Sequence, residues 1–248
     1  MKLDRVIAIR NNRTVYRDGD KCVKVFSKKY RKSEIYNEAL NISRIEETGL
    51  NIPEIIEITK INDKVALVTQ YIKGKTLDQL LKENPNKKTE YLETMANIQI
   101  EINSKQAPSI ITLKDKTLRN IEKTKLDNTL KNNLKSYISN IVSDSVLCHG
   151  DLCMSNIVIS DKGEPYIIDW SNATQGNYEY DIAKTLVSFH LEDKKELATE
   201  YFEIICNKTS INEQTIEKWF PIVAVNQLAK GIEKQEEVLT SFIQSIKF

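Results

Sequence analysis

The sequence has few cysteines and histidines, and their spacing does not suit a zinc site. The four cysteines are Cys22, Cys148, Cys153 and Cys206. No two of them form a C-x-x-C pair, and only two histidines, His149 and His190, accompany them. Because zinc sites take closely spaced cysteine and histidine ligands, the sequence predicts no zinc. Reduced thiols are expected, as is usual for cysteines in the cytosol.

The sequence also lacks long apolar runs and an excess of charge of either sign. No run approaches the roughly 20 residues that a helix needs to cross a bilayer. Residues 1–5 begin no apolar segment of the kind found in signal peptides. Lysine and arginine number 36 and aspartate and glutamate 35, so the net charge favours neither nucleic acid nor a membrane as a partner. The sequence therefore predicts a cytoplasmic protein.

The order of the expected elements predicts an α+β fold with two lobes. Strands are expected at residues 6–9, 14–16, 22–26, 52–58 and 65–68, with one helix at 32–47. Helices follow at 77–83, 87–104, 114–123, 127–142, 181–190, 192–207, 212–218 and 221–246. A chain of 248 residues is long enough for two lobes. We expect a small sheet lobe at 1–70, a mostly helical lobe at 71–248 and a hinge at 70–75.

Three polar residues, Asp151, Asn156 and Asp169, form the most informative pattern in the chain. Asp151 and Asn156 lie on a predicted loop, and Asp169 follows a predicted hairpin whose turn is the segment 161–163. A phosphoryl-transfer site needs an oriented hydroxyl and Mg²⁺ on the phosphates. One carboxylate can take the hydroxyl proton, while an amide oxygen and a second carboxylate bind the metal. A polar loop with a strand-capping aspartate is the structural alternative.

These residues also carry a resemblance to a known family. The motifs are His149-Gly150-Asp151-Leu152-x-x-x-Asn156, Ile168-Asp169-Trp170 and Asp181-Ile182-Ala183. In this order they resemble the aminoglycoside phosphotransferase and choline kinase family, whose members are small-molecule kinases with a two-lobed, protein-kinase-like fold. The resemblance covers essentially the whole chain and implies that fold, with a small antiparallel-sheet N-terminal lobe and a mostly helical C-terminal lobe.

The resemblance implies a role for each motif residue. Asp151 is implied as the catalytic base, Asn156 and Asp169 as the Mg²⁺ ligands, and Asp181 as an acid that braces the catalytic loop from a helix start. The chain departs from the family at residues 152–155, where many members have aromatic, histidine, proline and glycine residues. This departure removes no charged residue to which the resemblance assigns a role.

Lys24 and Glu38 are the expected anchor of the nucleotide phosphates. Lys24 shares a strand face with Cys22 and Phe26, so its ammonium leans toward a partly buried place and needs an anion. Glu38 projects from the apolar stripe of the helix at 32–47, where a carboxylate is costly unless a cation meets it. Such a pair orients the lysine toward phosphates in kinase-like sites. The alternatives are a Lys24 ammonium that reaches water from an edge strand and a solvated Glu38 on the helix rim.

The turn that would cover the phosphates has no glycine-rich motif. Between the first two strands the chain reads Arg10-Asn11-Asn12-Arg13-Thr14. Asparagine tolerates left-handed backbone angles, so this segment can form a tight turn that offers N–H groups to phosphate, with Arg13 adding charge. A plain exposed hairpin is the alternative.

The segment after the strand at 65–68 is the expected adenine site. By the resemblance, backbone groups of Gln70, Tyr71 and Ile72 bind the adenine edge. Thr76, shortly after, has the residue type of a helix N-cap, and we expect it to cap the helix that follows. The implied cofactors are ATP and Mg²⁺, although the sequence does not decide between ATP and GTP.

The acidic residues that follow Asp169 in the sequence suggest which charge the acceptor carries. Those on or near the following helices are Glu179, Asp181, Glu192, Asp193, Glu196, Glu200 and Glu203. If some of them line the site they attract cations, so we expect an amine-bearing acceptor, an aminoglycoside or a choline-like amino alcohol, ahead of a neutral sugar. The alternative is a solvated helix face, on which these acids pair with Lys184, Lys194 and Lys195.

The whole pattern predicts an ATP- and Mg²⁺-dependent kinase that phosphorylates a hydroxyl of a small molecule. Aminoglycosides, amino alcohols, sugars and amino acids all remain open as acceptors. A catalytically inactive nucleotide-binding or scaffold protein is one alternative, against which the intact Asp151, Asn156, Asp169 and Lys24 argue. A protein kinase is another, but only eleven residues separate Asp169 from Asp181 and no A-P-E triplet follows. The oligomeric state cannot be read from the sequence.

Overall fold

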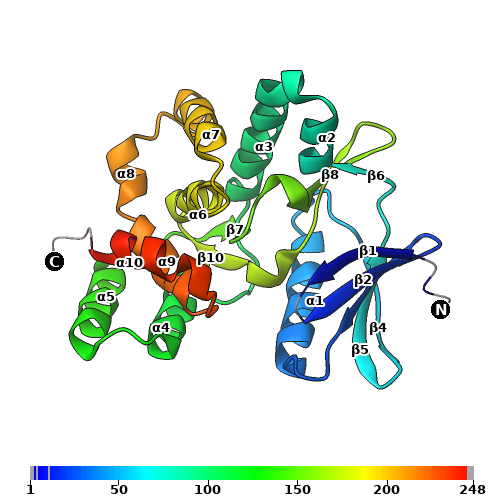
Figure 1. The fold of residues 1–248 in the computed structure, drawn as a ribbon, viewed down its shortest axis with the longest axis horizontal. Coiled ribbons are helices and arrows are strands. Elements are labelled where there is room, and N and C mark those ends of the chain that lie inside the picture. Colours follow the sequence, from blue (N-terminus) through cyan, green and yellow to red (C-terminus); the bar gives the residue numbers. More distant parts are fainter. Residues whose placement is uncertain (1–2, 4, 11, 245–248) are drawn as a thin grey trace. The chain divides into compact units, whose positions relative to one another are not determined.

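The computed structural model describes residues 3, 5–10 and 12–244. Contacts divide the chain into two compact units, Met1–Pro85 with Met154–Asn172, and Asn86–Cys153 with Ala173–Phe248. Strands dominate the first unit and helices the second (Figure 1), so the expected α+β class is confirmed. No helix within the described ranges is long and apolar enough to cross a membrane.

An antiparallel sheet of five strands forms the main part of the first unit. In spatial order its strands are β1 (Arg5–Arg10), β2 (Arg13–Asp18), β3 (Lys21–Phe26), β5 (Lys64–Gln70) and β4 (Ile55–Ile61). The turn between β2 and β3 is the expected one, because Gly19 takes a φ of 60° that residues with a side chain rarely adopt. Val23, Val25, Ala66 and Val68 form a buried cluster on this sheet.

Helix α1 (Lys32–Glu46) packs against β4 and β5 through an apolar stripe. The stripe consists of Ile35, Ala39, Ile42 and Ile45, all buried. Burial of one such isoleucine side chain is worth about 1.5–3 kcal/mol, so this face holds the helix in place. Glu38 lies within the stripe and is only 1% exposed, as its spacing predicts.

A second, three-stranded sheet in the first unit joins segments that are far apart in the sequence. Its order is β6 (Gly74–Thr76), β8 (Ile157–Ser160) and β9 (Pro165–Ile167). Thr76 caps α2 (Leu77–Glu83) as expected, and its oxygen accepts a hydrogen bond from the Gln79 backbone N–H at 3.2 Å. The short strand β6 was not expected. Because it pairs with β8, the compact units do not coincide with the continuous segments 1–70 and 71–248.

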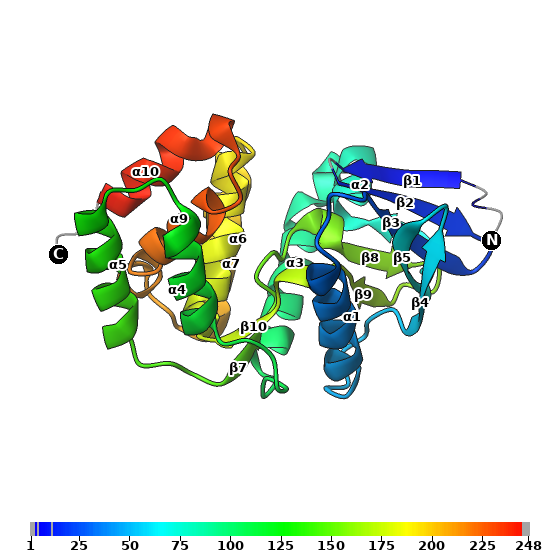
Figure 2. The ribbon, with the colours of Figure 1, turned by 90° about the horizontal axis from the view of Figure 1, so that it is seen from below.

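Helices make up most of the second unit (Figure 2). They are α3 (Lys88–Asn103), α4 (Leu113–Lys123), α5 (Asn128–Asn140), α6 (Tyr178–Leu191), α7 (Lys195–Thr209), α8 (Glu213–Glu217), α9 (Phe220–Leu228) and α10 (Glu236–Gln244). A two-stranded ribbon of β7 (Val146–Cys148) and β10 (Thr174–Gly176) completes the unit. Within it α6 packs against α7, α8 and α9, and α3 packs against α7 and β7.

Two of the expected elements have different bounds in the structure. The single helix expected at 221–246 is wrong within the described residues, because the chain turns after α9 and Gly231 takes a φ of 70° before α10 begins. Pro221 nevertheless lies in the first turn of α9, as expected. The strand expected at 52–58 is β4 and begins only at Ile55, since Pro53 lacks the N–H that a sheet requires.

Candidate functional site

In the first unit, the β8–β9 hairpin brings Asn156 and Asp169 together. Ile157 pairs with Ile167 across the hairpin, and the Ile168 N–H donates to the Asn156 carbonyl at 2.9 Å. Asp169 follows directly, with a φ of 66°. A left-handed backbone is strained for a residue with a side chain, and such strain clusters at functional sites. The hairpin that the sequence predicts therefore sets Asn156 beside Ile168, the residue directly before Asp169.

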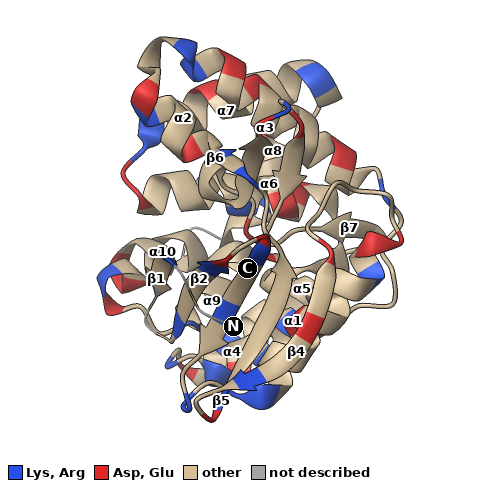
Figure 3. Ribbon diagram, turned by 90° about the vertical axis from the view of Figure 1, so that its right-hand side faces the viewer, with Lys and Arg blue, Asp and Glu red and all other residues tan. Residues whose placement is uncertain are grey.

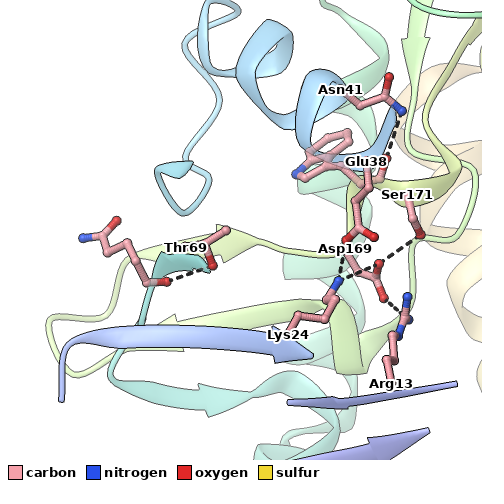
Figure 4. A network of polar contacts seen from close by, with 9 residues as sticks. Arg13, Lys24, Glu38, Asn41, Thr69, Asp169 and Ser171 are labelled. Carbon is pink, nitrogen blue, oxygen red and sulfur yellow. Dashed lines mark hydrogen bonds and ion pairs between the residues drawn. The ribbon is translucent and has the colours of Figure 1, made fainter. Parts of the chain in front are cut away.

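The Asp169 carboxylate lies among hydrogen-bond donors (Figure 4). Arg13 Nη2 donates to its Oδ2 at 2.7 Å, and the hydroxyl of Ser171 donates to its Oδ1 at 3.0 Å. Lys24 Nζ lies 3.4 Å from the same Oδ1. Two cations thus stabilise the charged form of a side chain that is still 21% exposed. Arg13, Lys24 and Ser171 therefore anchor the Asp169 carboxylate.

Lys24 and Glu38 form the ion pair that the sequence predicts (Figure 4). Lys24 Nζ donates to Glu38 Oε1, and the side chains are 16% and 1% exposed. Burial by itself would lower the pKa of the Lys24 ammonium, but Asp169 and Glu38 outweigh burial and raise it. Neither solvated alternative holds, because both side chains are mostly shielded from water. The role of the pair at nucleotide phosphates stays a prediction.

Arg13, in the turn that is expected to cover the phosphates, contacts Asp169. Its guanidinium points to Asp169 from the start of β2, a contact that spans 156 sequence positions. Sequence reasoning missed the contact, because no local pattern signals a pairing over that distance. Asn11, which was expected to shape the turn, lies outside the described residues.

The expected adenine segment has one backbone position that is still available. The Tyr71 N–H donates to the Asp20 carbonyl at 2.8 Å, and the Gln70 N–H donates to the Glu54 carbonyl at 2.9 Å. The Tyr71 ring lies under the guanidinium of Arg17, 4.5 Å from the ring centre. For Ile72 no backbone hydrogen bond is formed within residues 12–244. Of the three expected residues, Ile72 therefore retains an N–H for a ligand.

In the second unit, Asp181 braces the loop that carries Asp151. Its carboxylate accepts hydrogen bonds from the backbone N–H groups of His149 at 2.9 Å and Gly150 at 2.7 Å. Gln99 and Asn103 on α3 donate to it at 2.8 and 3.1 Å. Asp181 is fully buried in the first turn of α6, where the helix dipole also favours a negative charge. The bracing position implied by the resemblance is confirmed.

Lys184 is bonded to Asp151, a contact that the sequence analysis missed. Its Nζ donates to Asp151 Oδ1 and to Ser188 Oγ, both at 2.7 Å, and Lys184 is 2% exposed. Burial would raise the pKa of the Asp151 carboxyl, but Lys184 and Lys230 hold it well below its usual range. The expectation that Lys184 lies on a solvated helix face is therefore wrong. Its helical spacing from Tyr180 and Val187, both buried, is the signal that could have revealed it.

Two further lysines lie near Asp151 in the second unit. Lys116 is partly buried on α4, and Lys230 follows α9. Burial, followed by the charge of Lys230, lowers the pKa of Lys116 to about 7. Asp151 and Lys184 also act on this pKa. Sequence reasoning gave no role to either lysine, because α4 and α9 are distant in the chain and meet only in the folded unit (Figure 2).

The sequence suggested a cationic acceptor because several acids follow Asp169. Most of these acids have exposed side chains. Glu192 pairs with Lys194 at 2.7 Å. Glu200 pairs with Lys88 on α3, also at 2.7 Å. Blue and red segments are interspersed in Figure 3, as expected of solvated helix faces. The solvated alternative thus describes these acids, although Lys184 is not one of their partners.

The residues around Asp169 fit a magnesium ion. Magnesium prefers hard oxygen ligands and often binds through one or two carboxylates together with substrate phosphates. Asp169 supplies a carboxylate, and the neighbouring Asn156 supplies an amide oxygen. Among the described residues no three histidine, cysteine, aspartate or glutamate side chains gather into a metal-binding group. Asp169 and Asn156 are therefore the residues that would hold such an ion.

Comparison with known proteins gives a family match over most of the chain. The sequence pattern of the phosphotransferase enzyme family matches residues 5–212. No curated protein sequence matches the chain.

Solved structures of similar fold cover nearly the whole chain. A thermostable mutant of aminoglycoside phosphotransferase APH(4)-Ia has a TM-score of 0.69 at 15% identity, with 96% of this chain and 90% of that chain covered. Choline kinase LicA from Streptococcus pneumoniae has a TM-score of 0.67 at 13% identity, with coverages of 99% and 94%. ADP-bound aminoglycoside phosphotransferase APH(2'')-Ib has a TM-score of 0.62 at 16% identity, with coverages of 98% and 93%. The fold is therefore protein-kinase-like, with a small antiparallel-sheet N-terminal part and a mostly helical remainder.

Proposed function

The chain belongs to the phosphotransferase enzyme family, and we propose that it is an ATP- and Mg²⁺-dependent enzyme that phosphorylates a hydroxyl of a small molecule. The observation that carries this proposal is Asp169, whose strained backbone follows the β8–β9 hairpin and whose carboxylate contacts Lys24 and Arg13. We assign nucleotide binding to residues 1–70, and catalysis and acceptor binding to residues 71–248.

On the nucleotide side, Lys24 would contact the phosphates while Glu38 fixes its direction. Glu38 has no other hydrogen-bond partner for its buried Oε2 within the described residues, so its contact with Lys24 is its principal one. Arg13 adds a second positive charge, which suits the negative triphosphate. Backbone groups near Gln70, Tyr71 and Ile72 would bind the adenine edge, and the available Ile72 N–H supports this assignment.

Asn156 and Asp169 would hold Mg²⁺ through their side-chain oxygens. When bound, the ion neutralises charge on the transferred phosphoryl group. Asp169 would then exchange part of its contact with Arg13 and Lys24 for the metal.

On the acceptor side, Asp151 would orient the hydroxyl and accept its proton. The bond between the acceptor oxygen and the γ-phosphorus forms, the bond between that phosphorus and the bridging oxygen of ADP breaks, and ADP leaves. The low pKa of Asp151 makes it a weak base. A loose phosphoryl transition state needs orientation more than basicity, so a weak base suffices. Asp181 would act as a positioning residue through the N–H groups of the loop.

Ligands in the similar structures support nucleotide and small-molecule binding. The APH(4)-Ia mutant forms a ternary complex with AMP-PNP and hygromycin B, and LicA forms a complex with AMP. An amine-bearing acceptor remains our prediction from the sequence, together with a cytoplasmic location and the absence of nucleic-acid partners.

A coupled ADP-release screen tests the proposed function. Purified protein with MgATP would be offered an aminoglycoside, choline, a sugar, an amino acid and a generic peptide in separate reactions. We expect ADP release that depends on one small-molecule class and is lost in Asp151→Asn. If MgATP binds and no acceptor of any class releases ADP, the inactive-scaffold alternative replaces our proposal. Release with the peptide alone would favour a protein kinase.

A further inference from the structure

Helix α6 contacts the loop around Asp151 through three side chains on one of its faces. Asp181 accepts hydrogen bonds from the two backbone N–H groups that precede Asp151. Lys184 donates to the side chain of Asp151, and the Thr185 hydroxyl lies 3.2 Å from the Leu152 carbonyl oxygen. Residues three and four apart in a helix are neighbours, so one turn of α6 reaches the loop before, at and after Asp151. Of these three contacts, the one from Lys184 is made to a side chain and the others to the backbone.

The ammonium of Lys184 is held in a fixed direction. Its Nζ donates to Asp151 Oδ1 and to Ser188 Oγ, each at 2.7 Å. The Ser188 hydroxyl donates in turn to the Lys184 backbone carbonyl at 2.9 Å, which orients its oxygen to accept from the ammonium. The side chain of Lys184 is 3% exposed, whereas that of Asp151 is 36% exposed. The lysine therefore lies on the buried side of the pair, and the carboxylate is its more accessible member.

A charge at position 184 is costly for packing alone. Burial of an ammonium requires polar partners, and apolar residues of similar volume often stabilise a protein as well as a buried ion pair does. A role in packing would not need this charge, whereas a role at the carboxylate does. Burial raises the pKa of the Asp151 carboxyl, and Lys184 has the largest of the influences that lower it. The contact therefore both directs the proposed base and favours its ionised form.

We propose that Lys184 is a positioning residue for phosphoryl transfer, which holds the Asp151 carboxylate from its buried side in the direction that orients the acceptor hydroxyl. This inference rests on the proposed function. Asp181 and Thr185 fix the backbone of the loop, whereas Lys184 fixes the side chain that the acceptor meets. Lys184 acts through Asp151, so it needs no contact of its own with the acceptor or the nucleotide.

Steady-state kinetics of Lys184→Met give the first test, with the acceptor that the ADP-release screen identifies. Methionine keeps the length of the side chain but removes the ammonium. We expect kcat to fall about tenfold or more, because a small displacement of a reacting group can cost up to about 10²-fold, while the KM of ATP stays unchanged. Lys195→Met is the matched control, because it removes an exposed lysine from the neighbouring helix α7. Equal kcat in the two variants would overturn the inference, as would a rise in the KM of the acceptor alone, which would assign Lys184 to binding.

A double variant shows whether Lys184 acts through Asp151. Once Asp151→Asn has removed the carboxylate, the lysine has no base to direct. The combination of Asp151→Asn with Lys184→Met should therefore turn over no more slowly than Asp151→Asn alone. If the double variant loses the product of the two single effects, Lys184 acts independently of Asp151 and the inference is wrong.

Ser188→Ala tests the same direction of the lysine without removing a charge. The variant deletes the second acceptor of the Lys184 ammonium, so the ion pair remains but is less firmly oriented. We expect kcat to fall less than in Lys184→Met, again with an unchanged KM of ATP. Thr199→Ala is its control, because it removes a hydroxyl that bonds the carbonyl four residues earlier in α7, at an exposed position. If Lys184→Met does not give a cooperative thermal unfolding curve, Ser188→Ala decides, and a kcat equal to that of Thr199→Ala contradicts the inference.

Failure of the inference and failure of the proposed function give different results. If the unmodified protein releases ADP with an acceptor and Lys184→Met retains its kcat, the kinase stands and the inference is overturned. If the unmodified protein releases no ADP with any acceptor, the proposed function fails and the inference fails with it. The unmodified protein alone distinguishes the two cases.

Discussion

Lys24 in the first unit and Lys116 in the second are both partly buried lysines, and their pKa values shift in opposite directions. Lys24 is paired with Glu38 and lies near Asp169, so its pKa rises. The pKa of Lys116 falls because of burial and, after it, the charge of Lys230. Acids of the first unit favour the charge of the first lysine, whereas the surroundings of the second disfavour its charge. The net charge of the chain is nearly neutral, yet the electrostatic surroundings of its lysines differ from one unit to the other.

The largest effect should follow from Asp151→Asn in the second unit. The variant keeps the size of the side chain but cannot accept the hydroxyl proton, so kcat should fall on the order of 10²-fold or more. Affinity for MgATP, measured by calorimetry, should remain near that of the unmodified protein. Turnover close to normal with the true acceptor would refute the assignment of the base.

In the first unit, Asp169→Asn should weaken MgATP binding rather than turnover alone. Loss of one charged oxygen ligand should reduce affinity in calorimetry by roughly tenfold or more, the scale of a lost charge-assisted contact. The thermal unfolding curve should show that the fold is retained. Equal MgATP affinity in the variant would mean that the metal ligand lies elsewhere.

Lys24 and Glu38 should act as one unit. Lys24→Ala and Glu38→Ala should each raise the KM of ATP, and the double variant should be little worse than Lys24→Ala. Lys21→Ala is the control on the same strand, because its pairing with Glu57 is long, at 3.9 Å, and exposed. Strictly additive losses would show that the Lys24–Glu38 contact does not position the lysine.

The smallest expected effect concerns stability and Lys116. Its pKa is about 7 when folded, against roughly 10.4 in an unfolded chain. The unfolded chain therefore binds more protons between these values, and this lysine destabilises the fold most below pH 7. Lys116→Met should raise Tm by about 2 °C or more at pH 6, and the gain should shrink toward pH 10. A gain that is independent of pH would contradict the shift.

Features set by local patterns were predictable from the sequence. The Asp18-Gly19 turn and the Thr76 cap follow from the backbone preferences of a few neighbouring residues. Glu38 was identified because a carboxylate inside an apolar stripe requires a cation. Each of these patterns involves residues that are close in the sequence, and the folded chain keeps the local structure that each pattern favours.

Features that depend on distant contacts were not predictable. The strands β6 and β10 have three residues each, and pairing with remote segments defines them. The bond between Arg13 and Asp169 spans 156 positions. Lys184 looked like one charge on a mixed helix, because only the position of Asp151 in the folded chain gives it a buried partner. The lysines near the base were hidden for the same reason.

The close approach of Gly74 to β8 bears on how the enzyme could be evolved in the laboratory. A methyl group at position 74 would meet the Ile159 carbonyl oxygen at 2.0 Å, and the three nearest atoms, from Ile159 and Ser160, all belong to the backbone. Saturation libraries should therefore leave position 74 unchanged, since every side chain there would separate β6 from β8. Diversity is better placed on the helices of the second unit, where a side chain can be exchanged without breaking a sheet. Selection for new acceptors would then act on specificity at little risk to folding.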